Sequence, residues 1–309
     1  MAAFYLSQLA QTVETALEKT VVEEFAMNPV LAAIPFTDVT GGGLRYDKEE
    51  SLPTVGFRNV NGTWTAANGS VTQVYVPTKI AGGELDIDIA AVRRGQSRAS
   101  LEALKLKALR KNLALKLIKG DAQTTAAEFD GMQVLVTATA GNQLISAGST
   151  AAGDALSLAL MDQAKAYVDD STHWVMGTIM ATRFAAAARS SSVGGYVTVV
   201  PNQFGQPITY FAGLPILEIG TDSTGTEILG FTEAAATAGA TSATSIYCVS
   251  LSESGVHMIQ NSAPVISDLG EVDSAPKFVT RIEWDVALVT RHTRAASRIY
   301  GISNAAITA

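Results

Sequence analysis

The chain has 309 residues, with 22 basic and 29 acidic side chains and a formal net charge of −7. This balance argues against a protein whose whole surface coats nucleic acid. Apolar residues make up 47% of the chain, which excludes a disordered protein, and the single cysteine, Cys248, excludes a disulfide-stapled scaffold. Charged residues make up only 17%, which indicates that part of the surface faces other protein.

Targeting and membrane segments are not expected. No run approaches the roughly 18 apolar residues of a membrane span. The first 17 residues lack the basic start of a signal peptide. We therefore expect synthesis in a reducing cytoplasm and no membrane partner.

The N-terminal region reads as an arm. Residues 6–26 carry apolar side chains, Leu9 and Val13 among them, at the three- and four-residue spacing of an amphipathic helix. Pro29 and Pro35 then interrupt the pattern and predict an extended segment. A triple glycine, Gly41-Gly42-Gly43, ends this region.

A long hairpin is predicted next. One β-like run holds Val55, Phe57 and Val60, and a second holds Val71, Val74 and Val76. The tip between them contains Trp64 and two Asn-Gly turn signals. A two-stranded ribbon is marginal alone in water, so it must lean on another surface. The glycine clusters 41–43 and 82–83 are predicted to be hinges at its root.

The strongest helix signal covers residues 97–119, with Ser97 as N-cap and Gly120 at the end. It follows an alternating strand at residues 84–89. Two leucine stripes predict that the helix is covered from two sides. Its remaining positions are basic. They either face nucleic acid, or solvate the helix edge and pair with acidic neighbours: Lys105, Lys107, Arg110, Lys111, Lys116 and Lys119.

An α/β region follows. We expect helices at residues 154–168, capped by Asp154, and 178–189. Strands are expected at residues 174–176, 196–200, 208–211, 214–219, 246–251 and 255–259. The Gly/Thr/Ala/Ser-rich segment at about 220–244 is predicted to be a mobile loop. The last pattern, residues 281–302, predicts one long strand with a basic second half.

No catalytic constellation emerges. His173, His257 and His292 are far apart, and no metal, phosphate-loop or nucleophile-elbow motif is present. Asp86 and Asp88 share a strand face and could bind a hard cation, but a solvated strand edge gives the same pattern. Cys248 fits a small buried hydrophobe. We therefore predict no catalytic residue, metal or cofactor, and a structural protein.

Taken in order, these parts resemble the major capsid proteins of tailed bacteriophages, of the type named after phage Hong Kong 97. The turn Glu128-Phe129-Asp130-Gly131-Met132 and the ending Glu283-Trp284-Asp285 through Tyr300-Gly301-Ile302 are similar to that family's. The resemblance implies an α+β capsid fold. Its parts would be an N-terminal arm (1–43), an extended β-hairpin E-loop (44–83), a peripheral domain with a long spine helix (84–153), an α/β axial domain (154–262) and a peripheral return strand (263–309).

The resemblance also implies self-assembly into pentamers and hexamers of an icosahedral virion shell around phage double-stranded DNA. The expected partners are other copies, a separate scaffolding protein, a portal, a decoration protein and non-specifically bound DNA. Assembly is expected in the bacterial host cytoplasm. The hairpin tip, residues 59–70, holds no lysine, so no covalent cross-linking of subunits is expected.

Site residues follow from the same resemblance. The side chains expected between subunits are Phe57, Trp64, Val71, Val74, Leu9 and Val13. The expected hinges are Gly41, Gly42, Gly43, Gly82 and Gly83. The residues expected to face DNA are Lys107, Arg110 and Lys111.

Two other functions stay open. One is a cellular nanocompartment shell of the same fold, which would need a pocket for a cargo peptide. The other is a soluble enzyme that assembles scattered groups such as Asp86, Asp88 and His257. Particle size separates them, since an enzyme would be a monomer or small oligomer and a shell a megadalton particle.

Overall fold

The computed structural model describes residues 5–6, 8, 22–51, 53–95, 97–136, 143–189, 195–201, 207–235, 241–271 and 275–308. Most of the predicted helix at 6–26, including Leu9 and Val13, lies outside these residues. The described part of it, residues 22–26, is helical.

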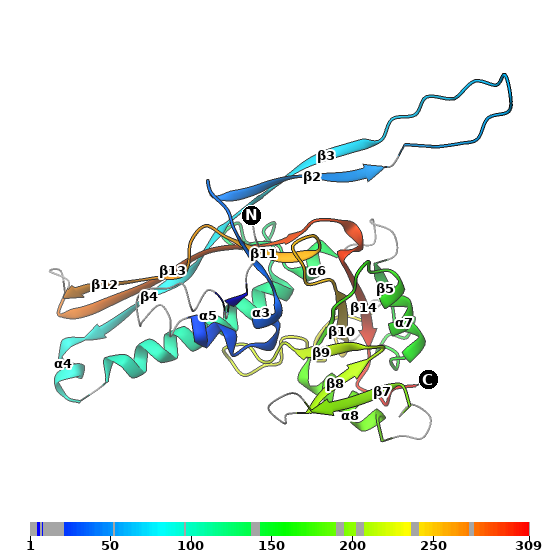
Figure 1. The fold of residues 1–309 in the computed structure, drawn as a ribbon. Helices are drawn as coiled ribbons and strands as arrows, with labels where there is room; N and C mark the ends of the chain where they lie inside the picture. Colours follow the sequence, from blue (N-terminus) through cyan, green and yellow to red (C-terminus); the bar gives the residue numbers. More distant parts are fainter. Residues whose placement is uncertain are drawn as a thin grey trace.

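A long strand, β13 (Lys277–Thr290), organises the first of two main sheets (Figure 1). One of its edges pairs with β4 (Lys79–Asp88). The other pairs successively with β11 (Val256–Gln260) and β12 (Val265–Glu271), and β1 (Phe36–Asp38) joins β11 in parallel. The strand can be this long because its apolar alternation, seen at Ile282, Trp284 and Val286, continues along its length.

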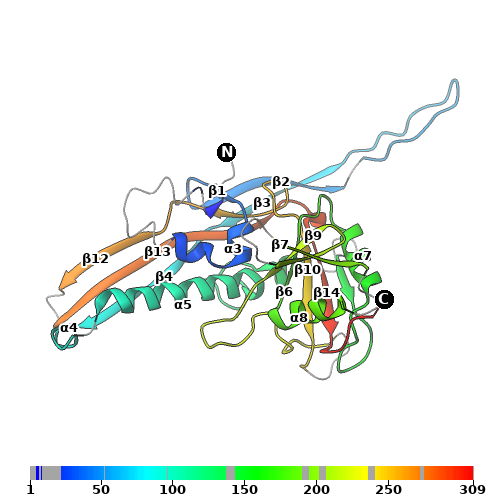
Figure 2. The same cartoon turned by 60° about the horizontal axis from the view of Figure 1, so that its bottom comes forward.

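The longest helix, α5 (Arg98–Lys119), lies along this sheet (Figure 2). The Ser97 hydroxyl accepts a hydrogen bond from Ser100 N, which confirms the predicted cap. The stripe with Leu106, Leu109 and Leu113 is buried, whereas Leu104 of the other stripe is 62% exposed. The prediction of cover from two sides is therefore wrong for Leu104, because the sheet packs against only one side of the helix.

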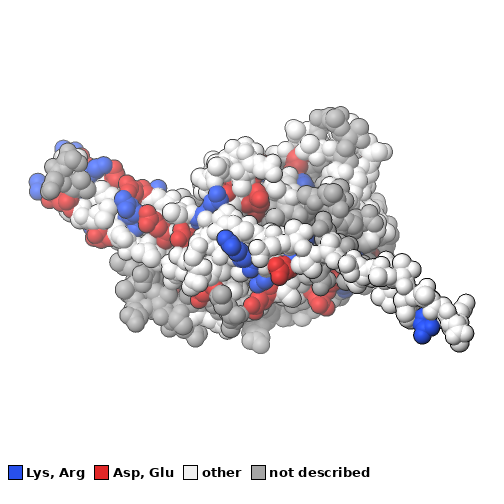
Figure 3. Space-filling view, turned by 90° about the horizontal axis from the view of Figure 1, so that it is seen from above, with Lys and Arg blue, Asp and Glu red and all other residues white. Residues whose placement is uncertain are grey.

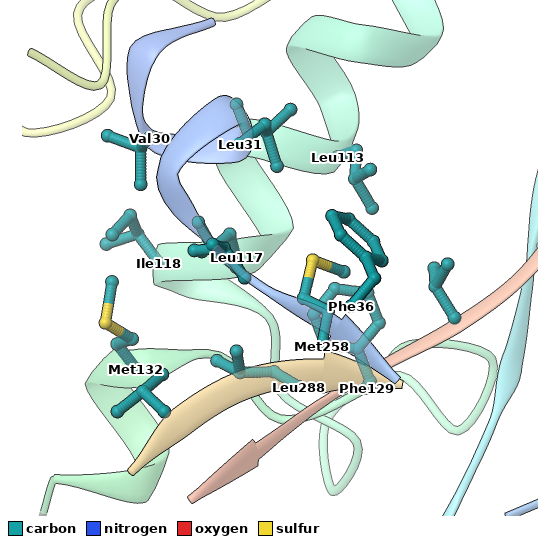
Figure 4. Packing of buried hydrophobic residues seen from close by; sticks show 14 of the residues in the cluster. Val30, Leu31, Phe36, Leu113, Leu117, Ile118, Phe129, Met132, Met258 and Leu288 are labelled. Carbon is teal, nitrogen blue, oxygen red and sulfur yellow. The ribbon is translucent and has the colours of Figure 1, made fainter. Parts of the chain in front are cut away.

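The first core lies between α5 and the sheet (Figure 4). Short helix α3 (Pro29–Ala33) adds Val30 and Leu31 to it, and α6 (Met132–Leu135) adds Met132. Phe25 and Phe36 pack on Trp284, with ring centroids 5.0 and 5.4 Å away. The arm residues from Phe25 to Phe36 are thus part of this core.

The second sheet has seven strands in the order β5-β14-β10-β6-β9-β8-β7. Their bounds are β5 (Leu144–Ser146), β14 (Ala296–Ile302), β10 (Thr244–Val249), β6 (His173–Met176), β9 (Leu214–Glu218), β8 (Pro207–Phe211) and β7 (Val197–Pro201). Helices α7 (Leu158–Ala166) and α8 (Thr178–Ala187) supply Met161 and Phe184 to a separate core around Trp174.

Several expectations for this region need correction. The predicted strand at 281–302 is interrupted by a short 3-10 turn, η2 (Thr293–Ala295), so β13 and β14 lie in different sheets. Arg294 holds this turn by an ion pair with Asp169 at 2.9 Å. Ser157 caps α7, because the carboxylate of Asp154 instead accepts bonds from the Thr150 amide and hydroxyl.

The described part of the loop at 220–244 is anchored rather than loose. Ile228 and Leu229 are buried in the first core. Glu233 forms a backbone bridge with Ala243 and an ion pair of 2.9 Å with Arg298 on β14. Specific contacts therefore override the composition that predicts mobility.

The predicted domain boundaries differ from the sheets. Strand β11 belongs to the β13 sheet although it precedes the expected boundary at 262, and β14 belongs to the seven-stranded sheet although it follows it. The cause is that the chain crosses between the sheets more than once. The domain ranges themselves stay predictions.

Candidate assembly interface

A two-stranded hairpin stands away from the rest of the molecule (Figure 1). Its strands are β2 (Gly43–Ser51) and β3 (Ser70–Pro77). At the root, Leu44, Tyr46 and Val76 pack against the first core. The described residues 53–69 contain no strand, so the predicted first strand around Phe57 is wrong. Pairing stops at Ser51 and Ser70. The strand that pairs with β3 lacks an apolar alternation in the sequence, because residues 47–50 are four consecutive charged residues.

The tip presents apolar side chains to solvent. Phe57 is fully exposed, Val55 is 88% exposed and Val60 is 91% exposed. Trp64 is 62% exposed, with the Arg58 guanidinium 5.8 Å from its ring centroid. Figure 3 shows few charges along the outstretched hairpin, whereas the opposite end of the molecule carries many. Residues 53–69 contain one charged side chain, Arg58. The tip is thus an apolar surface without cover from its own chain.

The predicted contact residues of the stem have mixed exposure. Val71 is exposed, whereas Val74 is half-buried and lies opposite Tyr46 across the ladder. Leu9 and Val13, predicted to contact neighbours from the arm, lie outside the described residues. The structure therefore brings Phe57, Trp64 and Val71 onto one projecting element.

Glycines at the root have unequal roles. Gly41 and Gly42 have φ of +88° and +75°, with open space around their α-carbons. They make the left-handed turn from which β2 departs. Gly82 and Gly83 instead lie inside β4, paired with Glu283 and Ile282 of β13. Their predicted place at the hairpin root is therefore wrong, although no observation tests whether any of these glycines moves.

A polar contact also holds the root. The Tyr46 hydroxyl donates to the carbonyl of Thr290 at 2.9 Å, and the Arg291 guanidinium lies 5.3 Å from the Tyr46 ring centroid. Sequence reasoning missed this contact, because its partners are 244 residues apart and neither belongs to a motif.

The fold matches solved shells. The SrpI encapsulin of Synechococcus elongatus aligns over 100% of this chain and 99% of its own, with a TM-score of 0.64 and 12% identity. The capsid of a native GTA particle aligns over 87% and 88%, with a TM-score of 0.60 and 12% identity. A Mycobacterium phage Bobi chain aligns over 88% and 89%, with a TM-score of 0.58 and 13% identity.

The chain has the Hong Kong 97 fold. This confirms the predicted α+β fold class and the resemblance drawn from the order of the sequence motifs. No protein-family model matches the sequence, and no curated protein matches it. The identification thus depends on three-dimensional arrangement rather than on sequence identity.

In this Hong Kong 97 fold, three of the six basic residues predicted for the helix form ion pairs or hydrogen bonds within the chain: Arg110, Lys111 and Lys116. Arg110 forms an ion pair with Glu24 at 3.0 Å, and Lys111 donates to the Asp222 carbonyl at 2.8 Å. Of the three residues predicted to face DNA, only Lys107 is exposed. The pairing part of the alternative therefore accounts for Arg110, and Lys111 is likewise bonded within its own chain.

The predicted carboxylate pair is also engaged. Asp86 is ion-paired with Lys277 across β4 and β13, and Asp88 caps α4 (Ile89–Arg93) through a 2.7 Å bond from Ala90 N. Within the described residues, no cluster of three or more His, Cys, Asp or Glu could hold a metal ion. No described helix is long and apolar enough to span a bilayer.

Three buried groups with reactive potential are held in their neutral forms. Burial raises the pKa of the Cys248 thiol to about 12, which keeps it protonated at neutral pH. Burial lowers the pKa of His173, whose Nδ1 lies 2.9 Å from the Thr172 hydroxyl. His257 is fully buried far from Asp86 and Asp88 in sequence, and no contact joins it to them among the described residues.

Proposed function

We propose that this protein is a shell-forming major capsid protein whose projecting hairpin binds a neighbouring copy. The exposed apolar side chains of the hairpin tip support this proposal. Phe57, Val55 and Val60 gain nothing from their own chain, and burying each would contribute about 1.5–3 kcal/mol. Monomers rarely keep such a surface uncovered. A second copy is the natural occupant, since every copy carries both the ribbon and a body on which it could lie.

Contacts of this type are head-to-tail. One copy donates its ribbon and receives that of another, so the contact repeats around a ring and closes into pentamers and hexamers. Several modest contacts per copy then make the shell stable. The Hong Kong 97 fold, shared with a GTA capsid, a phage chain and an encapsulin, supports this proposal.

The contents of the shell are a finer proposal. We infer a virion that encloses double-stranded phage DNA, assembled in the bacterial cytoplasm with a separate scaffolding protein, a portal and a decoration protein. Lys107 is the basic residue of α5 that is placed for non-specific contact with phosphates. The alternative is a nanocompartment, supported by the match to the SrpI encapsulin, whose TM-score of 0.64 lies above the 0.60 and 0.58 of the GTA and Bobi chains.

Electron microscopy of the protein expressed alone tests the proposal. We expect megadalton shells, or isolated pentamers and hexamers. A monodisperse monomer at high concentration, under all solution conditions, would refute it. Particles isolated from the organism that makes the protein distinguish the two contents. DNA inside the shell and a portal at one vertex support the virion, whereas shells filled by one cellular protein support the nanocompartment. Denaturing electrophoresis of mature particles should show single-chain bands, because the hairpin tip lacks lysine.

A further inference from the structure

A buried histidine lies on the strand next to the one that holds the hairpin root. His257 of β11 pairs with Val289 of β13, next to Thr290, which accepts the Tyr46 hydroxyl bond. Met258 faces the α5 side of the sheet (Figure 4), so strand alternation places His257 on the opposite face. Its side chain is fully buried, and neither ring nitrogen has a hydrogen-bond partner among the described residues.

Arg291 connects this histidine with the hairpin. Its backbone amide donates to the carbonyl of Gly255, two residues before His257, so strand alternation places Arg291 and His257 on the same face of the sheet. Its guanidinium lies over the Tyr46 ring, and its positive charge lowers the pKa of His257. The Arg291 Nε is itself buried without a partner within the described residues. Two cationic or potentially cationic groups therefore face each other beneath the root of the hairpin.

The surroundings offer no compensating charge. From β2 the facing group is Tyr46, whose pKa is raised by burial, and from β1 it is uncharged Thr37. On the same face of β13 the nearest carboxylate is Asp285, four residues from Val289 and thus about 13 Å along the strand. No ion pair joins Arg291 or His257 to a carboxylate in the described part of the chain.

We propose that Tyr46, Arg291 and His257 form a proton-operated clamp that positions the hairpin. In the closed state Arg291 holds the Tyr46 ring while His257 is neutral. A proton taken from solvent by His257 places two positive charges together in a buried site. The least costly response is for Arg291 to move into water, which releases the Tyr46 ring and frees the hairpin root.

The direction of the pH effect follows from the two states. Burial, and then the positive charge of Arg291, lower the pKa of His257 to about 4. An opened root exposes His257, which then titrates near its ordinary value of about 6.5. Falling pH between about 6.5 and 4 therefore favours the open root, on the order of 100-fold in the opening equilibrium.

Hydrogen exchange of the isolated full-length subunit tests the clamp without depending on assembly. Amides of β2 and β3 should lose protection as pH falls from 7.5 to 4.5, after correction for intrinsic rates. His257→Gln should abolish this dependence, whereas His292→Gln, at the adjacent half-buried histidine, should retain it. Tyr46→Phe should loosen the root by a constant factor at every pH.

Two results would overturn the clamp: pH-independent protection in the unsubstituted chain, or an unchanged dependence in His257→Gln. If His257→Gln does not fold, Arg291→Gln provides the second arm. This variant lacks both the contact with Tyr46 and the charge that opposes protonation of His257. Its root should therefore be loose already at pH 7.5, and its protection should change much less as the pH falls. A pH dependence as large as that of the unsubstituted chain contradicts the proposal. A subunit that never assembles but shows this response would separate failure of the shell function from failure of the clamp.

Discussion

At the scale of single residues, Gly82 shows how closely β4 and β13 approach. A β-carbon at this position would clash with the backbone carbonyl of Ile282, which cannot move without disturbing the ladder. Gly56, in the hairpin tip, has open space around it and an unstrained backbone.

Gly82→Ala is therefore expected to lower the free energy of unfolding by about 1–3 kcal/mol, as overpacking usually does. Denaturant unfolding of the isolated subunit measures this. Gly56→Ala serves as the matched control and should leave the midpoint unchanged. Equal midpoints for both variants would contradict the close approach of the two strands.

Residue-scale features were the least predictable from sequence. A glycine pair in a hinge and a glycine pair inside a paired strand look the same in the sequence. Only the close approach of Ile282 to Gly82 distinguishes the two cases. The role of Tyr46 at the hairpin root was likewise not predictable, because it depends on contacts with Thr290 and Arg291, which are distant in the sequence. The exposure of the hairpin tip was predictable from the sequence, because Trp64 lies between two Asn-Gly turn signals and is not part of an apolar periodic pattern.

At the scale of elements, the ion pair of Glu233 and Arg298 fastens the loop after β9 to β14. Both side chains are nearly buried, and Ser245 donates to the same carboxylate oxygen of Glu233. The second oxygen, Oε1, has no partner among the described residues. Most helices and strands of this half were predictable from periodicity. The anchoring of the loop was not, because its composition is that of a linker and its partner is 65 residues away.

Removal of one partner leaves a buried charge, so Glu233→Ala should destabilise the subunit by about 3–5 kcal/mol. The double variant Glu233→Ala with Arg298→Met should recover part of that loss, because neither charge remains. Thermal unfolding of the single and double variants checks the coupling. Losses that simply add would show that the pair does not interact.

At the scale of the whole molecule, a compact body carries an uncovered ribbon. The overall fold was predictable because arm, ribbon, spine helix and α/β region follow one another in a specific order. The break between β13 and β14 was not predictable, because the sequence from Thr290 to Ala295 continues the strand-like pattern. The turn is held by the ion pair of Arg294 with Asp169, which is distant in the sequence.

The variant Phe57→Ser with Val60→Ser should leave the unfolding midpoint of the isolated subunit unchanged, since both side chains are exposed there. It should abolish shells or raise the concentration needed for them by at least about tenfold. Light scattering against concentration measures this, with Thr65→Ser as the control in the same segment. Normal assembly of the double variant would show that the hairpin tip does not contribute to the interface between subunits.

The near absence of charge between Pro53 and Gly69 has a thermal consequence. Arg58 is the one charged group there, and it already lies over Trp64. Hydrophobic attraction weakens on cooling. Salt weakens contacts between charged groups, and the hairpin tip has only one such group. Shells held together by such hairpin contacts should therefore be less stable at about 0 °C and insensitive to high salt concentration.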